Sequence, residues 1–191
     1  MKTLKRIFKA VIKRIELRFA NLSDERKRNY LIKQGACIGE KTRFNCHVDA
    51  FGTEPYLVSV GENCLIAADV HFVTHDGGIK VLNALNKFGR RMDKIAPIKV
   101  GSNVYIGMGA YIMPGVEIGD NAVIGAGAIV THSIPGNSVA VGIPAKVIKT
   151  IDEYYKAASS DENIYPSAGM TPRQKRAFYE NIDLREKYFE R

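Results

Sequence analysis

Residues 98–130 read IKVGSNVYIGMGAYIMPGVEIGDNAVIGAGAIV, and this stretch decides the fold. Within it and just beyond it, small or aliphatic residues recur every six positions in two phases. The first phase comprises Ile98, Val104, Ala110, Val116, Ala122, Ala128 and Ile134, and the second comprises Val100, Ile106, Ile112, Ile118, Ile124 and Val130. Helices repeat every 3.6 residues and strands every two, so neither explains this period. Short hexapeptide periods are typical of a β-solenoid.

The period also predicts the geometry of the coil. Three hexapeptides form one triangular turn, so residues about 18 apart should stack as neighbouring strands around a narrow apolar core. Glycine follows the second apolar phase directly at four positions: Gly101, Gly107, Gly119 and Gly125. We expect these glycines at corners where the backbone adopts conformations that a Cβ would penalise.

The same pattern continues toward the N-terminus but slips twice. Val48 to Val58 spans ten residues and Val70 to Ile98 spans 28, each four more than a multiple of six. The slips predict two loops that leave the coil, and loops on a rigid scaffold are where function concentrates. The earlier apolar pairs are Ala36/Ile38, Thr42/Phe44, Val58/Val60, Cys64/Ile66 and Val70/Phe72.

Three segments follow from these patterns. Residues 1–34 are predicted to be helical and basic, residues 35–150 to form the solenoid with a loop at 76–97, and residues 151–191 to be a helical extension. A helix should begin after Ser23, a good N-cap, and end near Gly35. Another should begin at Thr171-Pro172 and run to about Phe189.

The first segment is amphipathic. Apolar residues from Leu4 to Phe19 fall at helical spacing on one stripe, and Lys and Arg surround it. Such a helix can lie at an anionic membrane surface, or it can pack on the solenoid or on a partner subunit. The sequence leaves both possibilities open.

Composition limits the other classes of function. The net charge is +8, but much of the excess lies between Met1 and Lys33, and no nucleic-acid-binding motif accompanies it. No uninterrupted apolar run of about 20 residues and no secretory signal are found. The cysteines Cys37, Cys46 and Cys64 match neither a zinc nor a redox motif. We therefore expect a cytoplasmic protein that does not bind nucleic acid, and peripheral contact with the inner membrane face remains open.

The motifs of residues 98–148 closely resemble the hexapeptide-repeat acyltransferases, and most of all their galactoside, maltose and polysaccharide O-acetyltransferase branch. The resemblance rests on the segments GSNVYIG at 101–107, PGVEIGDN at 114–121, IGAGA at 124–128 and VGIPAKVI at 141–148. It implies an all-β fold, a left-handed parallel β-helix with helices at both ends. It also implies a homotrimer with sites between subunits, acetyl-CoA as the donor and no required metal.

The predicted general base is His75, in the sequence THDGG at 74–78 where the larger loop begins. Acyl transfer from a thioester to a hydroxyl needs a base that is neutral near pH 7, and imidazole suits that task. A histidine at this place is the general base in the resembling family. The remaining histidines, His47, His71 and His132, are interpreted as surface or pocket-lining residues.

Acceptor contacts are predicted on both loops. Stacking by three hexapeptides places Tyr56 beneath Thr74, so Glu54 and Tyr56 are candidate neighbours of His75. Asp49 resembles the polar positions that bind the acceptor sugar in the family. The basic residues of the larger loop, among them Arg90 and Arg91, suggest a glycan that carries phosphate or carboxylate, such as a nucleotide-linked or lipid-linked sugar.

Donor contacts are predicted at five positions. Met108 and Ala126 are three hexapeptides apart, so their backbone amides should line one groove in which an extended pantetheine arm can lie. Thr131, Lys146 and Lys149 match cofactor-contacting positions of the family, and the lysines can bind nucleotide phosphates by charge.

The predicted activity is direct transfer of an acetyl group to a hydroxyl of a sugar or glycan in a ternary complex. Three alternatives remain from the sequence: N-acetylation of an amino sugar, a non-catalytic binding scaffold, and a zinc enzyme related to the γ-carbonic anhydrases. The zinc enzyme requires three converging histidines, and the spacing of His71, His75 and His132 does not favour it.

Overall fold

The computed structural model describes residues 2–182. Contacts divide the chain into two compact units, Met1–Tyr154 and Tyr155–Arg191. The first contains all the described strands and is the unit that positions the candidate site. None of the described helices is long and apolar enough to cross a membrane.

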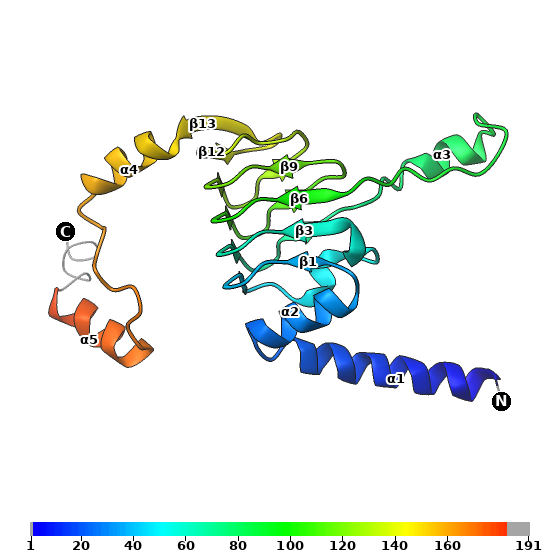
Figure 1. Ribbon diagram of the computed structural model, residues 1–191, viewed down its shortest axis with the longest axis horizontal. Coiled ribbons are helices and arrows are strands. Elements are labelled where there is room, and N and C mark those ends of the chain that lie inside the picture. The colour runs from blue at the N-terminus through cyan, green and yellow to red at the C-terminus, as the bar shows by residue number, and fades with distance from the viewer. Residues whose placement is uncertain (1, 183–191) are drawn as a thin grey trace. The chain divides into compact units, whose positions relative to one another are not determined.

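The first unit is built from three sheets of short strands, one strand per sheet in each full turn of the chain (Figure 1). Every pair of described strands is parallel except the last, β12 with β13. The first sheet contains β1 (Cys37–Ile38), β3 (Val58–Val60), β6 (Ile98–Val100) and β9 (Glu117–Ile118). The second contains β2 (Arg43–Phe44), β4 (Leu65–Ile66), β7 (Tyr105–Ile106), β10 (Val123–Ile124), β12 (Ser138–Val141) and β13 (Lys146–Thr150), and the third contains β5 (His71–Phe72), β8 (Tyr111–Ile112) and β11 (Ile129–Val130).

Strand register confirms the predicted stacking and both phase slips. Val123 pairs with Tyr105, so the offset between these turns is the expected three hexapeptides. The offset is 22 between β2 and β4, where Arg43 pairs with Leu65, because four extra residues lie between Val48 and Val58. It is 40 between β5 and β8, where His71 pairs with Tyr111, because that turn also contains the larger loop.

The apolar core runs through the middle of the coil. All thirteen residues of the two phases are at most 4 % exposed, and the earlier pairs from Ala36/Ile38 to Val70/Phe72 are buried as well. Each of the strands β1 to β11 therefore contributes at least one inward side chain to a column shared by successive turns. The sequence prediction of this core is confirmed.

The reason for the recurrent glycines differs from the one predicted. Gly107 does not have a left-handed backbone; instead, a Cβ there would lie 2.5 Å from the backbone nitrogen of Ala126 in the next turn. At Gly119 it would lie 2.4 Å from the nitrogen of Gly136. These glycines are required because two turns of backbone approach each other closely, not because the corner needs a positive φ.

Positive φ values occur at another corner, occupied mainly by asparagine. Asn63, Asn103, Asn121 and Asn137 all have φ between 54° and 56°. The side-chain amide of each donates to the amide oxygen of the next, over 3.1, 2.9 and 2.9 Å. Asparagine tolerates the left-handed region better than other residues with a Cβ. Lys41, with φ 58°, occupies the same corner in the first turn.

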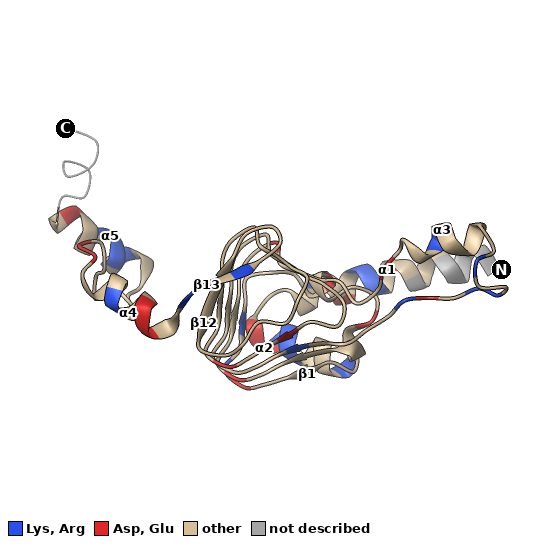
Figure 2. Ribbon diagram, turned by 90° about the horizontal axis from the view of Figure 1, so that it is seen from above, with Lys and Arg blue, Asp and Glu red and all other residues tan. Residues whose placement is uncertain are grey.

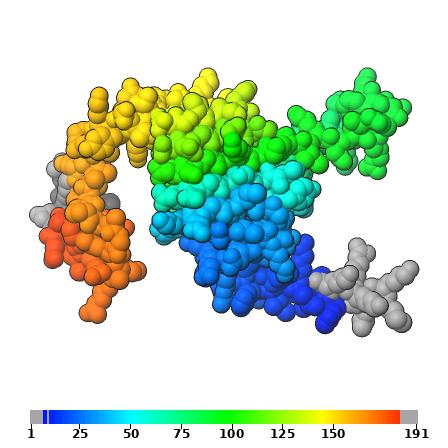
Figure 3. Space-filling view, in the orientation of Figure 1, coloured from blue at the N-terminus to red at the C-terminus, as the bar shows by residue number. Residues whose placement is uncertain are grey.

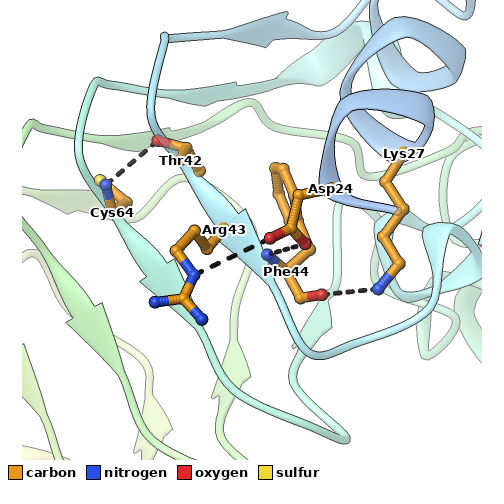
Figure 4. A network of polar contacts seen from close by, with 6 residues as sticks. All are labelled: Asp24, Lys27, Thr42, Arg43, Phe44 and Cys64. Atoms are coloured by element: carbon orange, nitrogen blue, oxygen red, sulfur yellow. Dashed lines mark hydrogen bonds and ion pairs between the residues drawn. The ribbon is translucent and has the colours of Figure 1, made fainter. Parts of the chain in front are cut away.

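Two helices precede the coil: α1 (Lys2–Ala20) and α2 (Asp24–Lys33). The Ser23 hydroxyl caps α2 by accepting from the nitrogen of Arg26, as predicted. Polar contacts fix α2 to the first turn (Figure 4). Asp24 accepts from the backbone nitrogen of Phe44 at 2.9 Å, and the Lys27 ammonium donates to the Phe44 carbonyl. The helix therefore covers the open end of the coil and pairs backbone groups that would otherwise be exposed there.

The two predicted loops hold short helices. The smaller contains the 3₁₀ turns η1 (Val48–Phe51) and η2 (Pro55–Leu57), and the larger contains α3 (Ile79–Ala84). The larger loop projects beyond the coil (Figure 3). His75 and Ile95 form an isolated antiparallel bridge at its base, which ties its two ends together.

The end of the chain is helical as predicted. Helix α4 (Ile151–Ser159) follows β13 directly and spans the boundary between the two units. Helix α5 (Pro172–Asn181) begins with a capping box in which Thr171 and Gln174 bond reciprocally. In the second unit, Tyr165 packs edge to face on Phe178 and Tyr179. The predicted end of this helix near Phe189 lies outside the described residues.

Candidate active site

A pocket of about 870 Å³ opens at the base of the larger loop and contains His75. Its walls come from the smaller loop, from the residues after β5, from α3, and from the segment that leads from the larger loop back to the coil. The lining residues are Thr53, Glu54, His75, Asp76, Gly77, Ile79, Lys80, Asn83, Ala84, Arg91, Asp93, Lys94 and Ile95.

The imidazole of His75 is oriented by Glu54. Oxygen Oε2 of Glu54 lies 3.1 Å from Nδ1 of His75 and also accepts from the hydroxyl of Thr74 at 2.7 Å. The other oxygen, Oε1, accepts from the hydroxyl of Thr53 at 2.6 Å. The Glu54 side chain is 18 % exposed, whereas that of His75 is 53 % exposed. His75 is thus held from behind while its ring faces solvent.

The carboxyl of Glu54 has a lowered pKa. The largest causes are the hydrogen bonds from Thr53 and then from Thr74, with a smaller effect from His75. Glu54 is therefore ionised at neutral pH and can only accept hydrogen bonds. Nδ1 of His75 must then carry a hydrogen, which leaves the lone pair of Nε2 free to accept a proton.

Glu54 was predicted as a neighbour of His75, but the assumed offset was wrong. The offset between neighbouring turns is 22 for the strands before the smaller loop, and the residue that contacts His75 is Glu54, 21 positions earlier. Leu57, 18 positions before His75, does not line the pocket. Tyr56 lies elsewhere: it is 61 % exposed, and its Cβ faces Gly35. Asp76, judged a poor partner from the sequence, turns away from His75 and binds the Gly78 nitrogen and Lys94.

The predicted basic residues of the loop divide between pocket and surface. Both arginines are exposed, but Arg91 lines the pocket and Arg90 does not. Lys94 also lines the pocket, but it is paired with Asp76 at 3.0 Å. Three cations and three carboxylates line the pocket in all, so its formal charges balance.

Asp49 belongs to a second, smaller pocket of about 320 Å³ at the start of the smaller loop. His47 and His71 line the same pocket, and His71 stacks on Tyr111 with ring centroids 4.8 Å apart. Within one chain, the structure does not bring Asp49 into the pocket that contains His75.

The predicted donor positions Met108 and Ala126 do stack in successive turns. The carbonyl of Met108 accepts from the nitrogen of Gly127, and that of Ala68 accepts from Gly109 in the turn before. Both side chains are exposed. This corner comes just before β8 and β11, whereas His75 comes three residues after β5, so the two lie toward opposite ends of the strands of the β5–β8–β11 sheet. Neither Met108 nor Ala126 lines the pocket of His75.

Thr131, Lys146 and Lys149 lie near the last turn. Thr131 directly follows β11, and its hydroxyl is 2.9 Å from Nδ1 of His132. The segment before β13 stacks on β11, since Ala145 donates to the carbonyl of Ile129. Lys146 is exposed and Lys149 is half-buried.

Sequence reasoning assigned no role to three residues of the site: Thr53, Thr74 and Lys80. Thr74 is 1 % exposed, and its position two residues after the buried Phe72 marks it as a polar residue facing inward. A buried hydroxyl needs a partner, which was a usable signal. Lys80 lines the pocket from α3, and its placement depends on the path of the loop.

Comparison with known proteins decides the family. Residues 97–132 match the model of the bacterial transferase hexapeptide (six repeats). The chain is 41 % identical over 152 residues to Protein CapG of Staphylococcus aureus, an alignment that covers 79 % of this chain and 81 % of that protein. This chain belongs to the hexapeptide-repeat acyltransferases.

Further members with named activities align with the same region. Identity to galactoside O-acetyltransferase of Escherichia coli (strain K12) is 37 % over 100 residues, which covers 52 % of this chain and 47 % of that enzyme. The crystal structure of a maltose O-acetyltransferase from Clostridium difficile 630 matches with TM-score 0.50 and 29 % identity over 72 % of this chain and 83 % of that one. The chain is accordingly an acetyltransferase of the hexapeptide-repeat family.

Among the described residues, no group of three or more His, Cys, Asp or Glu side chains is placed to hold a metal ion.

Proposed function

We propose that this acyltransferase moves an acetyl group from acetyl-CoA to a hydroxyl of a sugar or glycan, with His75 as the general base. One observation carries the proposal: an exposed imidazole fixed by an ionised carboxylate at the mouth of an 870 Å³ pocket. The names of the galactoside and maltose O-acetyltransferases support the class of acceptor.

The geometry supports direct transfer. Nε2 of His75 removes the proton of the acceptor hydroxyl as that oxygen attacks the acetyl carbon, and the imidazolium then protonates the departing thiolate of coenzyme A. Glu54 stabilises the imidazolium and keeps the hydrogen of Nδ1 in place. No covalent bond to the protein is formed, and holding both substrates together supplies much of the rate by proximity.

The assembly we propose is a homotrimer with a left-handed coil, as the family resemblance implies. Support comes from the separation of the two half-sites in one chain. Met108 and Ala126 come before β8 and β11, whereas His75 comes after β5, and neither donor position lines the pocket that contains His75. A neighbouring subunit can supply the donor corner that His75 lacks in its own pocket.

The acceptor, in this proposal, carries phosphate or carboxylate. Arg91 and Lys80 both line the pocket, and among the described residues neither takes part in an ion pair. A bidentate guanidinium is well suited to either anion. Because the charges of the whole pocket balance, the preference for an anionic acceptor depends on these two side chains.

The proposal is tested by a thiol-release assay with acetyl-CoA and a panel of sugars, sugar nucleotides and lipid-linked oligosaccharides, with mass spectrometry of the product. His75→Ala should lower kcat about 100-fold or more while binding of acetyl-CoA, measured by calorimetry, is retained. His71→Asn is the matched control and should keep kcat within the same order of magnitude. Near-normal turnover of His75→Ala would remove His75 from the mechanism.

A further inference from the structure

The apolar stripe of α1 remains uncovered in the structure. It consists of six large side chains that are between 47 and 68 % exposed. These residues are Ile7, Phe8, Val11, Ile12, Ile15 and Phe19. An exposed contiguous apolar surface of this kind marks an interaction site.

The helix contacts its own coil through a different face. Leu17 and Ala20 pack against the core at the C-terminal end of α1. They follow Ile15 by two and five residues, so at about 100° per residue they point roughly 140–160° away from the centre of the stripe. The contact that fixes α1 to the coil therefore directs the stripe outward, and the coil of the same chain cannot cover it.

The charged residues of α1 are almost all basic, and Lys or Arg is visible in blue on the part of this helix that Figure 2 colours. Its nineteen residues include seven Lys or Arg and a single acidic residue, Glu16, which is paired with Lys33 at 3.5 Å. Arg14 and Arg18 are exposed and border the stripe on one side. In α2, the guanidinium of Arg26 lies 4.0 Å from the centre of the Phe19 ring and adds a cation at the end of the stripe.

These charges indicate what covers the stripe. If α1 of a second copy packed against this stripe, the Lys and Arg residues of the two helices would lie close together, and their like charges oppose that contact. An anionic lipid surface neutralises the cations and accepts the apolar side chains below its headgroups. We propose that α1 lies in the plane of an anionic membrane and holds the protein there as a peripheral protein.

The experiment is cosedimentation of the full-length protein with vesicles of phosphatidylcholine alone or of phosphatidylcholine and phosphatidylglycerol mixed two to one. Binding should require the anionic lipid and weaken as salt is raised. Phe8→Glu/Ile15→Glu should lower the partition coefficient at least about tenfold, because two apolar side chains no longer enter the membrane. The matched control is Val81→Glu/Leu85→Glu, which places the same charges on exposed apolar residues of the larger loop and should bind like the wild type.

A second double variant distinguishes loss of membrane binding from misfolding. Arg14→Glu/Arg18→Glu leaves the stripe intact and should also lose binding to anionic vesicles, with circular dichroism unchanged. Binding of the wild type to phosphatidylcholine alone as strong as to the anionic vesicles would overturn the proposal, as would no binding to either. A change of oligomeric state in Phe8→Glu/Ile15→Glu, measured by light scattering, would assign the stripe to a contact between subunits instead.

Discussion

At the scale of single residues, three contacts of the Glu54 carboxylate, with two hydroxyls and one imidazole, define the geometry of the candidate site. Glu54 accepts from Thr53 and Thr74 and has its remaining contact with Nδ1 of His75, so its position is fixed independently of the histidine. A base whose partner is already fixed loses little conformational freedom when the substrate binds. Thr74 is buried and donates to the Glu54 carboxylate, so in the proposed mechanism it also helps to orient the base.

The lowered pKa of Glu54 predicts how stability depends on pH. A carboxyl with a lower pKa in the folded state stabilises the protein above its ordinary, unfolded value of 4.5, and this contribution is lost as pH falls through the folded value. Glu54→Gln should therefore have a lower Tm than the wild type at pH 7, and the difference should shrink below about pH 4.5. Thermal melts from pH 7 to pH 3 measure this. Glu62→Gln, in an exposed turn of the coil, is the control. A Tm difference between Glu54→Gln and the wild type that did not change with pH would contradict the prediction.

Arg90 and Arg91 allow a matched test of acceptor charge. Arg91 lines the pocket and Arg90 does not, although the two are adjacent and chemically identical. Arg91→Ala should raise the KM for an anionic acceptor about tenfold or more, the value of one hydrogen bond to a charged group. Arg90→Ala should leave this KM nearly unchanged. The KM values are measured by steady-state kinetics with an anionic acceptor and with its neutral analogue. If both variants raised the KM equally, the effect would come from the positive charge of the loop as a whole and not from a contact with Arg91.

At the scale of elements, the coil depends on corners that tolerate unusual backbone or close approach. From Asn63 to Asn137, the asparagines adopt the left-handed backbone that this corner requires. Their side-chain amides also hydrogen-bond to one another from turn to turn. In the first turn the same corner is occupied by Lys41, which also has a positive φ. A lysine tolerates this conformation less well than asparagine, and its side chain has no amide that could join the ladder.

Lys41→Asn should accordingly stabilise the protein. Asparagine tolerates φ 58° better than lysine, and its amide would be placed to donate to Asn63, so we expect a gain of about 0.5–1 kcal/mol. Urea unfolding at one fixed protein concentration measures it, because assembly also affects stability. Lys87→Asn, at an exposed position without a positive φ, should change stability little. The explanation would be contradicted if the free energy of unfolding changed equally in both variants, or did not change in Lys41→Asn.

At the scale of the whole molecule, the proposed trimer divides each site between two chains. His75 and the corner at Ala126 lie on opposite sides of one face of the coil, so a chain presents two different half-sites to its neighbours. A closed ring of three chains joins such unlike surfaces in every interface.

Mixed trimers test this arrangement. His75→Ala and Ala126→Arg should each be inactive alone, the first without its base and the second with a blocked donor corner. Trimers purified by two tags after coexpression should regain about a third of the wild-type activity, because one interface in three then combines two intact half-sites. Ala126→Ser should remain active as the control for the substituted position. Inactive mixed trimers would show that each site is built within one chain.

The sequence by itself determined the parts of this protein that depend on local repetition. The six-residue period identified the stacked strands, the buried columns and both loops, since each apolar position faces the same core in every turn. Family motifs and the chemistry of imidazole predicted His75 as the general base, which stays a prediction. The helix starts at Ser23 and Thr171 followed from capping, which is also local.

Tertiary structure alone decided what depends on contacts between distant segments. The longer offset between the turns at this level placed Thr53 and Glu54 at His75 and Tyr56 elsewhere, because extra residues in one turn change every neighbour. The path of the larger loop selected Arg91 and Lys80 over Arg90. Close approach between turns, rather than backbone conformation, explains Gly107 and Gly119, since only the stacked structure shows which atoms would meet a Cβ.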